Sequence, residues 1–320
     1  MDISVCTTVY NEANSVREFL ASLLAQSLPP GEIVVVDGGS TDGTYDVLRA
    51  FADQHACIRL IHDPTCNRQH MASPIAHGRN AAIGEAHGEI IAVTDAGCRL
   101  DPHWLEEIVR PFREDPSVEV VGGWYEPWIE TPFERCAASV SFTVTKEALA
   151  RHMFPSSRSV AFRKSLWERV GGYPEVTYVA EDSLFNERWK QAGARFVFTD
   201  RAVVYWKPRG TFAALCRQFF RYSQADALSG IHGSLHLRWA SKYLMFLVLV
   251  VMGFVWHWLG LVAAAALMLS YGFYLWLKRA DKQLLFCPVV LKIIIDATRV
   301  AGYITGKITS LFGRAHTLSL

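Results

Sequence analysis

An apolar tract from Tyr243 to Leu277 constrains the folding of this 320-residue chain more than any other feature. His257 is the only group in the tract that titrates near neutral pH, so the tract favours lipid or a protein interior over water. As a single helix it would be roughly 52 Å long, against about 30 Å for the apolar core of a bilayer. We therefore expect a hairpin of two rather short helices over 243–277 that turns near residues 257–260.

The sign of the charge changes close to the start of this tract. After Ala240 the chain has eight Lys or Arg and two Asp or Glu, a net charge of +6, whereas the first 240 residues carry a net charge of −5. Basic residues flank the tract on both sides: Lys242, Lys278, Arg279 and Lys282. The positive-inside rule then places both ends of the hairpin in the cytosol. A net-negative N-terminal part also argues against a basic nucleic-acid binder.

A second apolar segment, 284–305, differs from the first because polar residues interrupt it: Pro288, Lys292, Asp296 and Arg299. We expect it to lie at the membrane interface or to pack against the other helices rather than to span alone. These patterns divide the chain into a domain over 1–240 and a membrane-associated region over 241–320.

The seven cysteines are scattered, with no C-x-x-C pair and no zinc-type spacing: Cys6, Cys57, Cys66, Cys98, Cys136, Cys216 and Cys287. This pattern predicts reduced thiols in a cytosolic domain. Strand-like sequence begins at Ile3, so we expect no signal peptide.

The first 100 residues alternate between strand and helix patterns, which predicts βαβ units and a largely parallel sheet. The expected strands are 3–9, 33–36, 58–61 and 90–94, and the expected helices are 16–24, 44–54 and 76–86. Beyond Pro102 we expect a helix to Arg113, a strand at 118–121, a helical stretch at 134–151, and strands near 159–162 and 196–204. Ligands of such sheets bind beyond the carboxyl ends of the strands.

Acidic residues stand at two of these strand ends. Asp37 opens the Gly-rich run 37–44 after a buried strand, and Asp95 follows the fourth strand. A tight turn with a helix cap, or a capping aspartate, is the simpler interpretation of each alone. An aspartate at such an end can also hold Mg²⁺ or Mn²⁺ against a diphosphate. Neither a P-loop nor a dinucleotide fingerprint is present, but a third acidic site, Glu181 with Asp182, makes the combination specific.

The chain resembles the family 2 glycosyltransferases of the GT-A fold, and most closely the bacterial membrane-associated members of exopolysaccharide and cell-envelope synthesis. The resemblance implies an α/β fold with a Rossmann-like, mostly parallel mixed sheet, flanking helices and C-terminal membrane helices. It covers residues 1 to about 225 through six motifs in order: Thr8 to Glu12, Val35 to Thr44, Gly78 to Gly84, Thr94 to Gly97, Gly171 to Glu175, and Glu181-Asp182.

The family resemblance also implies roles for individual residues. Asp182 would be the base that deprotonates the acceptor hydroxyl, with Glu181 beside it, and Asp95 would be the first residue of the metal-binding D-x-D motif. Gly97 stands where the second Asp usually stands, so a divalent cation, Mg²⁺ or Mn²⁺, would be held by Asp95, phosphate oxygens and water. Donor binding would fall to Thr8, Tyr10, Glu12, Asp37, Asp42, Arg79 and Asp95.

A further segment, Arg217, Gln218, Arg221 and Tyr222, resembles the Q-x-x-R-W segment of processive family members, with Tyr222 in place of Trp. Those members use it near the donor diphosphate and the acceptor. The alternative is an amphipathic interfacial helix whose arginines meet lipid phosphate. Trp124 and Trp128 either line a sugar pocket or serve in packing.

The resulting hypothesis is an inverting glycosyltransferase that moves one sugar from a nucleotide-sugar donor to a lipid-linked or polysaccharide acceptor. We expect it at the bacterial inner membrane, with membrane lipid as a partner, the catalytic domain in the cytoplasm and no nucleic-acid partner. Two terminal spans without a longer bundle favour transfer of one sugar over processive synthesis. The alternatives are a non-catalytic GT-A-like membrane scaffold and a nucleotidyltransferase, although the latter would show a Gly-rich loop with Arg and Lys after its first strand.

Overall fold

A computed structural model describes residues 2–142, 145–152, 154–176, 180–230, 232–278 and 287–317. It contains two compact units, one formed by Met1–Trp128 with Val144–Lys207 and the other by Ile129–Thr143 with Pro208–Leu320. Compactness alone does not show that a segment folds independently, so the domain boundary expected at residue 240 stays a prediction.

The first unit is built on one eight-stranded mixed sheet, as the family resemblance implied. Its strand order is β3-β2-β1-β4-β7-β6-β8-β5. The strands β3, β2, β1 and β4 are parallel neighbours, whereas β7 is antiparallel to both β4 and β6. The bounds are β1 Ile3–Val9, β2 Glu32–Asp37, β3 Ile58–His62, β4 Ile90–Val93, β5 Cys98–Leu100, β6 Val120–Pro127, β7 Val160–Arg163 and β8 Phe196–Trp206.

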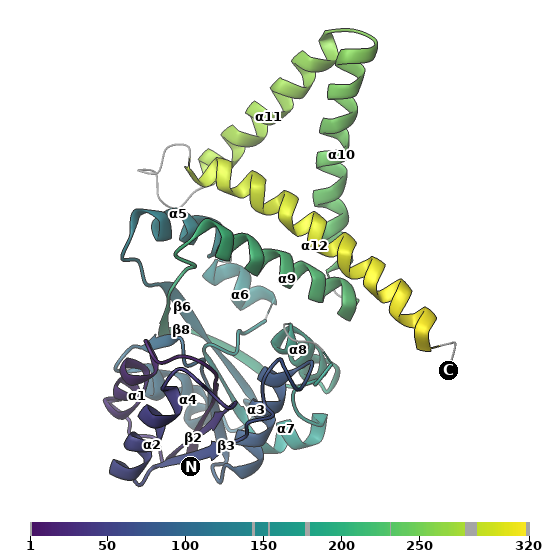
Figure 1. Ribbon diagram of the computed structural model, residues 1–320. Helices are drawn as coiled ribbons and strands as arrows, with labels where there is room; N and C mark the ends of the chain where they lie inside the picture. Colours follow the sequence, from purple (N-terminus) through teal and green to yellow (C-terminus); the bar gives the residue numbers. More distant parts are fainter. Residues whose placement is uncertain are drawn as a thin grey trace. The chain divides into compact units, whose positions relative to one another are not determined.

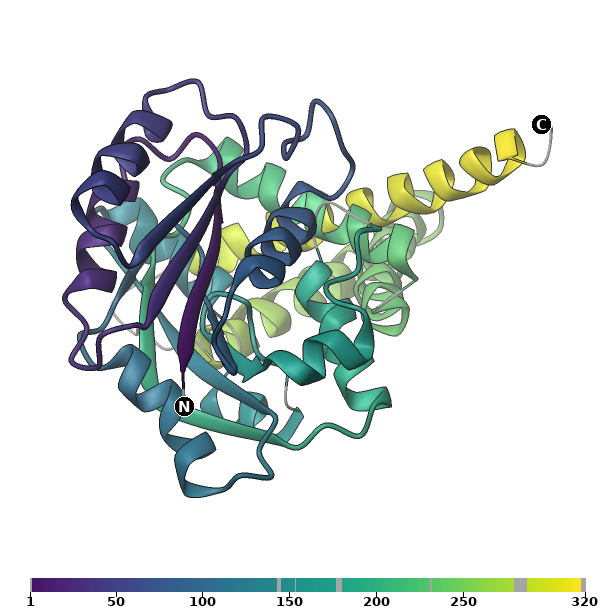
Figure 2. The ribbon, with the colours of Figure 1, turned by 90° about the horizontal axis from the view of Figure 1, so that it is seen from below.

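Helices cover both faces of this sheet because alternate strand residues point to opposite sides. Val35 and its neighbours pack with α1, α2 and α4, whereas Val34 and Val36 pack on the face that α3, α7 and α8 cover. Figure 2 shows α1 and α2 on one side of the strands and α3 on the other. The bounds are α1 Val16–Leu24, α2 Thr44–Gln54, α3 Pro74–Glu85, α4 Trp104–Glu114, α6 Lys146–His152, α7 Lys164–Val170 and α8 Glu181–Gln191.

The middle of the chain differs from the expected pattern in two places. The helical stretch expected over 134–151 is two helices, α5 (Pro132–Ser141) and α6, which belong to different units. The strand expected at 118–121 begins at Val120 and continues to Pro127, because pairing with β8 extends it past Gly122 and Gly123. Because these glycines have no side chain, the alternation of apolar and polar residues that indicates a strand cannot be seen there.

Helices form the second unit: α5, α9 (Phe212–Ser229), α10 (Gly233–Val255), α11 (Leu259–Lys278) and α12 (Cys287–Thr317) (Figure 1). Small residues let α12 approach α9 closely. A β-carbon at Gly302 would lie 2.3 Å from the carbonyl oxygen of Phe220, and one at Gly306 would lie 2.5 Å from that of Gln224. Any larger side chain at either glycine would therefore push the two helices apart.

The expected apolar hairpin is present, with α10 and α11 joined at Trp256–Trp258. However, α10 begins at Gly233, ahead of the tract, so it is longer than expected. Among the described helices, α10 is long and apolar enough to cross a membrane, and Leu259–Tyr274 is a shorter apolar stretch. This result is consistent with membrane association of the C-terminal region.

The segment expected at 284–305 corresponds to α12, and its residues 284–286 lie outside the described part of the chain. The packing interpretation of this segment finds support in Asp296, which is fully buried. Its carboxylate accepts from Lys242 Nζ at 3.2 Å and Tyr271 Oη at 2.7 Å, and it also pairs with Lys292.

One expectation about the cysteines is wrong. Cys136 of α5 and Cys287 at the start of α12 form a disulfide, with 6.2 Å between their Cα atoms. Their separation of 151 residues explains why no local spacing in the sequence indicated the pair. The other five cysteines are free thiols, as expected: Cys6, Cys57, Cys66, Cys98 and Cys216.

Candidate active site

The candidate site lies where the carboxyl ends of β1, β2 and β4 meet. The chain order along the sheet reverses between β1 and β4, and in open α/β sheets a ligand crevice forms at such a reversal. Asp37 is the last residue of β2, and the loops after β1 and β4 carry Glu12 and Asp95. The topology therefore brings these predicted site residues to one edge of the sheet.

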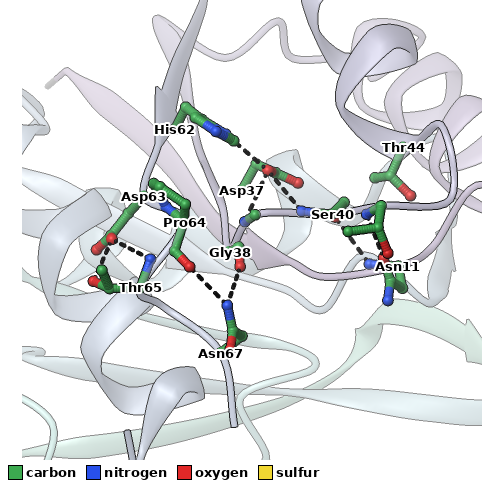
Figure 3. A network of polar contacts seen from close by, with 12 residues as sticks. Asn11, Asp37, Gly38, Ser40, Thr44, His62, Asp63, Pro64, Thr65 and Asn67 are labelled. Carbon is green, nitrogen blue, oxygen red and sulfur yellow. Dashed lines mark hydrogen bonds and ion pairs between the residues drawn. The ribbon is translucent and has the colours of Figure 1, made fainter. Parts of the chain in front are cut away.

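Asp37, the last residue of β2, is fully buried at this edge. Its Oδ2 accepts from the backbone N–H of Gly39 at 3.0 Å and of Ser40 at 3.1 Å, and it lies 3.0 Å from His62 Nδ1. Figure 3 shows these groups converging on the carboxylate. Its Oδ1 is buried and has no hydrogen-bond partner among the described residues. A buried acceptor without a partner is costly, so this oxygen is suited to a donor group on a ligand.

The loops after β1 and β2 are joined by a polar network. Asn11, at a φ of 55°, donates its N–H to Ser40 Oγ and accepts from the N–H of Thr41, each at 2.9 Å. Asp42 accepts from Thr44 N–H and from Ala13 N–H, both at 3.1 Å. Burial alone would raise the pKa of Asp42, but the hydrogen bonds from Thr44 and Ala13 lower it below its ordinary value.

This network changes the interpretation of two predicted donor-binding residues. The Asp42 carboxylate holds the two loops together, and a Glu12 carboxylate oxygen accepts from Ser15 Oγ at 2.7 Å. Both side chains therefore already have protein partners. Their part in donor binding stays a prediction.

The other two residues predicted on the first strand and its loop have different surroundings. Thr8 packs against α3, where a β-carbon at Gly78 would lie 2.3 Å from its Oγ1. Only glycine fits at that position, so the Gly78 of the motif allows the close packing of α3 on β1. Tyr10 is 38% exposed and is accessible to a ligand.

Arg79 of α3 joins the second and third acidic sites. Its Nη2 donates to Asp95 Oδ1 at 2.6 Å and its Nη1 donates to Glu181 Oε1 at 2.7 Å, while its guanidinium lies 5.3 Å from the ring centre of Tyr173. Burial alone would lower the pKa of Arg79, but the carboxylates of Asp95 and Glu181 raise it. Arg79 therefore stays cationic and fixes the distance between the two acidic motifs.

Asp95 remains partly open to solvent, with a side chain that is 34% exposed. Its Oδ2 lies 3.8 Å from Arg158 Nε. Burial alone would raise the pKa of Asp95, but the charges of Arg79 and Arg158 hold it below its ordinary value. The carboxylate is therefore ionised at neutral pH.

The residues around Asp95 fit a divalent cation only as a site with one protein carboxylate. Within the described part of the chain no group of three or more His, Cys, Asp or Glu side chains is placed to hold a metal ion. Gly97 offers no side chain, and burial raises the pKa of the Cys98 thiol, which makes it a poor ligand. Oxygens of a bound diphosphate and of water would have to supply the other ligands.

The third acidic site forms the first turn of α8. Glu181 is buried, and burial together with the charge of Asp182 raises its pKa above the ordinary value, although Arg79 opposes this. Asp182 is partly exposed, and its Oδ1 accepts from the N–H of Ser183 at 2.8 Å. Ala180, just before the helix, has a left-handed φ of 74°. Asp182 is thus a carboxylate held at a helix N-terminus, one residue from the Arg79 bridge.

Asn80 lies in the motif Gly78 to Gly84, and no role was predicted for it. Its Oδ1 accepts from the N–H of Tyr173 at 2.8 Å and from Trp167 Nε1 at 3.1 Å. Its Nδ2 donates to the carbonyl oxygen of Tyr173 at 2.9 Å and to Glu175 Oε1 at 2.7 Å. Asn80 therefore ties the segment 171–175 to α3. Its place next to Arg79 in the motif was the available signal.

The segment that resembles Q-x-x-R-W lies on α9, in the second unit. Gln218 is buried and donates from Nε2 to Tyr222 Oη at 2.9 Å, whereas Arg217 and Arg221 are exposed. The four residues are thus divided between a packed and an exposed face of the helix. A role for them near the diphosphate or the acceptor stays a prediction.

Comparison with known families agrees with this geometry. Residues 4–154 match the model of "Glycosyl transferase family 2", and residues 90–286 match that of "Glycosyl transferase family group 2". The chain belongs to the family 2 glycosyltransferases. The expected family and enzyme class are thereby confirmed.

Curated relatives include one named as a glycosyltransferase and one named as a succinoglycan biosynthesis protein. Glycosyltransferase AglE of Haloferax volcanii is 27% identical over 229 residues, which cover 70% of this chain and 72% of the relative. Succinoglycan biosynthesis protein ExoA of Rhizobium meliloti is 25% identical over 232 residues, which cover 68% of this chain and 66% of the relative.

Solved structures confirm the GT-A fold of this glycosyltransferase. The mannosyltransferase PcManGT from Pyrobaculum calidifontis, in complex with GDP-Man and Mn²⁺, matches with a TM-score of 0.65 at 24% identity, covering 97% of this chain and 87% of that one. Residues 1–349 of S. aureus TarS, in complex with UDP-GlcNAc, match with a TM-score of 0.53 at 18% identity, covering 98% and 92% of the two chains.

Proposed function

We propose that this glycosyltransferase moves one sugar from a nucleoside diphosphate sugar to a lipid-linked or polysaccharide acceptor, with inversion at the anomeric carbon. The observation that carries the proposal is the buried Arg79, which holds Asp95 and Glu181 on its two nitrogens at 2.6 Å and 2.7 Å. We call Glu181-Asp182 the base motif. The bridge fixes the distance between this motif and the end of β4, where the diphosphate binds.

Each group has a defined task in the proposed reaction. Asp37 Oδ1, which has no partner among the described residues, accepts from the nucleobase, and Asp95 faces the diphosphate. Asp182 takes the proton of the acceptor hydroxyl as that oxygen attacks the anomeric carbon from the side opposite the leaving diphosphate. A single displacement of this kind inverts the configuration and forms no covalent sugar intermediate.

A divalent cation would be held by Asp95 together with oxygens of the donor and water. When bound there, it would offset the charge that develops on the leaving diphosphate. The Mn²⁺ in the PcManGT complex supports this part of the proposal.

The apolar C-terminal helices support the proposed acceptor class. We infer that α10 and the shorter apolar α11 anchor the enzyme to the bacterial inner membrane, with the catalytic unit in the cytoplasm, where nucleotide sugars are made. The polysaccharide relative ExoA supports an acceptor in exopolysaccharide or cell-envelope synthesis.

The test is release of nucleoside diphosphate from UDP-, GDP- and dTDP-sugars by the detergent-solubilised full chain, with membrane lipid extract as acceptor. Asp182→Asn should abolish turnover but leave donor binding intact. Asp53→Asn, the same change at an exposed residue of α2, is the matched control and should leave turnover unchanged. Donor binding without turnover in the wild type, unchanged by Asp182→Asn, would favour the non-catalytic scaffold instead.

A further inference from the structure

Arg158 lies opposite Asp95 because of the register of two antiparallel strands. In the pairing of β4 with β7, Ala92 faces Ala161 and Val93 faces Val160. The same register, continued two residues past the last pair, brings residue 158 opposite residue 95. The 3.8 Å between Arg158 Nε and Asp95 Oδ2 agrees with this placement.

Aromatic rings hold the Arg158 side chain in place. Its guanidinium carbon lies 4.0 Å from the ring centre of Trp206 and 5.8 Å from that of Tyr125, and its Nη1 donates to Ser156 Oγ at 3.0 Å. The side chain is 20% exposed. A guanidinium fixed in this way loses little conformational entropy when it binds an anion.

The charged groups around Asp95 leave Arg158 as a cation that can meet a bound diphosphate. Arg79 is shared between two carboxylates, and Gly97 contributes no charge where the family pattern has a second aspartate. A diphosphate brings several negative charges to the site. The Arg158–Asp95 distance exceeds that of a hydrogen bond, whereas a guanidinium can hold phosphate oxygens with two parallel hydrogen bonds.

We propose that Arg158 binds the diphosphate of the donor beside Asp95 and supplies positive charge that a metal ion on two carboxylates would otherwise bring. This inference rests on the proposed function, since it needs a nucleoside diphosphate at Asp95. It has a direct consequence: the enzyme binds nucleoside diphosphates without a divalent cation.

Nucleotide binding to the solubilised full chain tests this, measured by calorimetry with UDP, GDP and dTDP and with the corresponding monophosphates. Each titration is made in EDTA and again in Mn²⁺. The variants are Arg158→Gln and Arg158→Lys, and the matched control is Arg49→Gln, an exposed arginine of α2. A thermal melt of each variant checks that it is folded.

The wild type should bind its diphosphate in EDTA. Arg158→Gln should weaken that binding by at least about tenfold but leave monophosphate binding unchanged, and Arg158→Lys should lie between the two. An equal loss of monophosphate and diphosphate binding would show a structural role and overturn the inference. Diphosphate binding that needs Mn²⁺ and ignores Arg158→Gln would also overturn it, while the proposed function would stand. If the wild type binds none of these nucleotides in either condition, both fail.

Discussion

Arg79 and Glu181 form a buried ion pair with 2.7 Å between Nη1 and Oε1, although 102 residues separate them in the chain. The pair joins α3 to the first turn of α8, and the other end of the same guanidinium reaches Asp95. Two segments that carry different parts of the proposed reaction are thus fixed to one side chain.

Removing this side chain should destabilise the first unit strongly. In Arg79→Ala the Glu181 carboxylate stays buried without its partner, and a broken buried ion pair typically costs about 3–5 kcal/mol. Arg79→Lys should lose less stability but most turnover, since an ammonium cannot span both carboxylates in the way a guanidinium does. Chemical unfolding and turnover measure these effects. An Arg79→Ala protein as stable as the Arg49→Ala control would contradict this account.

Glu181 should make the free energy of unfolding fall as the pH rises, which is opposite to the effect of a carboxylate whose pKa is lowered by folding. Its pKa is raised, chiefly by burial, so the folded protein binds more protons at this site than the unfolded chain does. The free energy of unfolding therefore falls as the pH rises from the unfolded pKa, about 4.3, through the folded pKa. Glu181→Gln removes this titration and keeps an oxygen that accepts from Arg79.

Thermal unfolding between about pH 4 and pH 7 tests the contribution of Glu181. The unfolding midpoint of Glu181→Gln should decline less with rising pH than that of the wild type. Glu18→Gln, at an exposed position of α1, should follow the wild type. Equal slopes in all three proteins would show that Glu181 does not titrate in this way.

Backbone strain just before the base motif predicts a stabilising substitution. Ala180 has a φ of 74°, a conformation that costs a residue with a β-carbon about 1–2 kcal/mol. Ala180→Gly should therefore raise the free energy of unfolding. Ala192→Gly, at the other end of α8 with a φ of −77°, should lower it. If both variants lose stability in chemical unfolding, the strain is absent.

The sequence predicted the architecture well wherever a strand supplied a mainly apolar run. β1 to β4 were predicted because each run is buried by helices on one or both sides. β5 has only three residues, too few for a period of two to appear. α8 was missed because it is a mainly polar helix with few buried residues, among them Phe185 and Trp189.

The candidate site was predictable only in part, for a similar reason. Asp37 ends one parallel strand and Asp95 follows another, so their meeting at one sheet edge follows from the order of elements. The position of Arg158 opposite Asp95 depends on the antiparallel register of β7 with β4, and the sequence pattern does not reveal that register. The Arg79 bridge likewise depends on how α3 and α8 pack, although the motifs around both residues marked them.

Asn80 should prove to be a positioning residue for the base motif. Asn80→Asp keeps its shape but turns an amide donor into an acceptor that faces the carbonyl of Tyr173 and the carboxylate of Glu175. The segment 171–175, which precedes Asp182 in the chain, should lose its tie to α3. We expect turnover to fall about tenfold to a hundredfold, with a smaller change in the KM for the donor.

Steady-state kinetics of nucleoside diphosphate release checks this expectation for Asn80. Gln54→Glu makes the same chemical change at an exposed position of α2 and should leave turnover unchanged. If Asn80→Asp changes only the KM for the donor, the residue acts in donor binding rather than in holding the base motif.

The Cys136–Cys287 link predicts how many thiols the denatured protein shows. Without reductant five thiols should react with a thiol reagent, and after reduction all seven should react. Replacing both linked cysteines by serine should lower the free energy of unfolding by about 2–4 kcal/mol, whereas Cys216→Ser, a free cysteine of α9, should have little effect.

A reducing cytosol disfavours such a disulfide. Blocking thiols at the moment of lysis therefore distinguishes a disulfide present in the cell from one formed after extraction. Seven reactive thiols in extracted protein that was kept free of reductant would disprove the disulfide altogether.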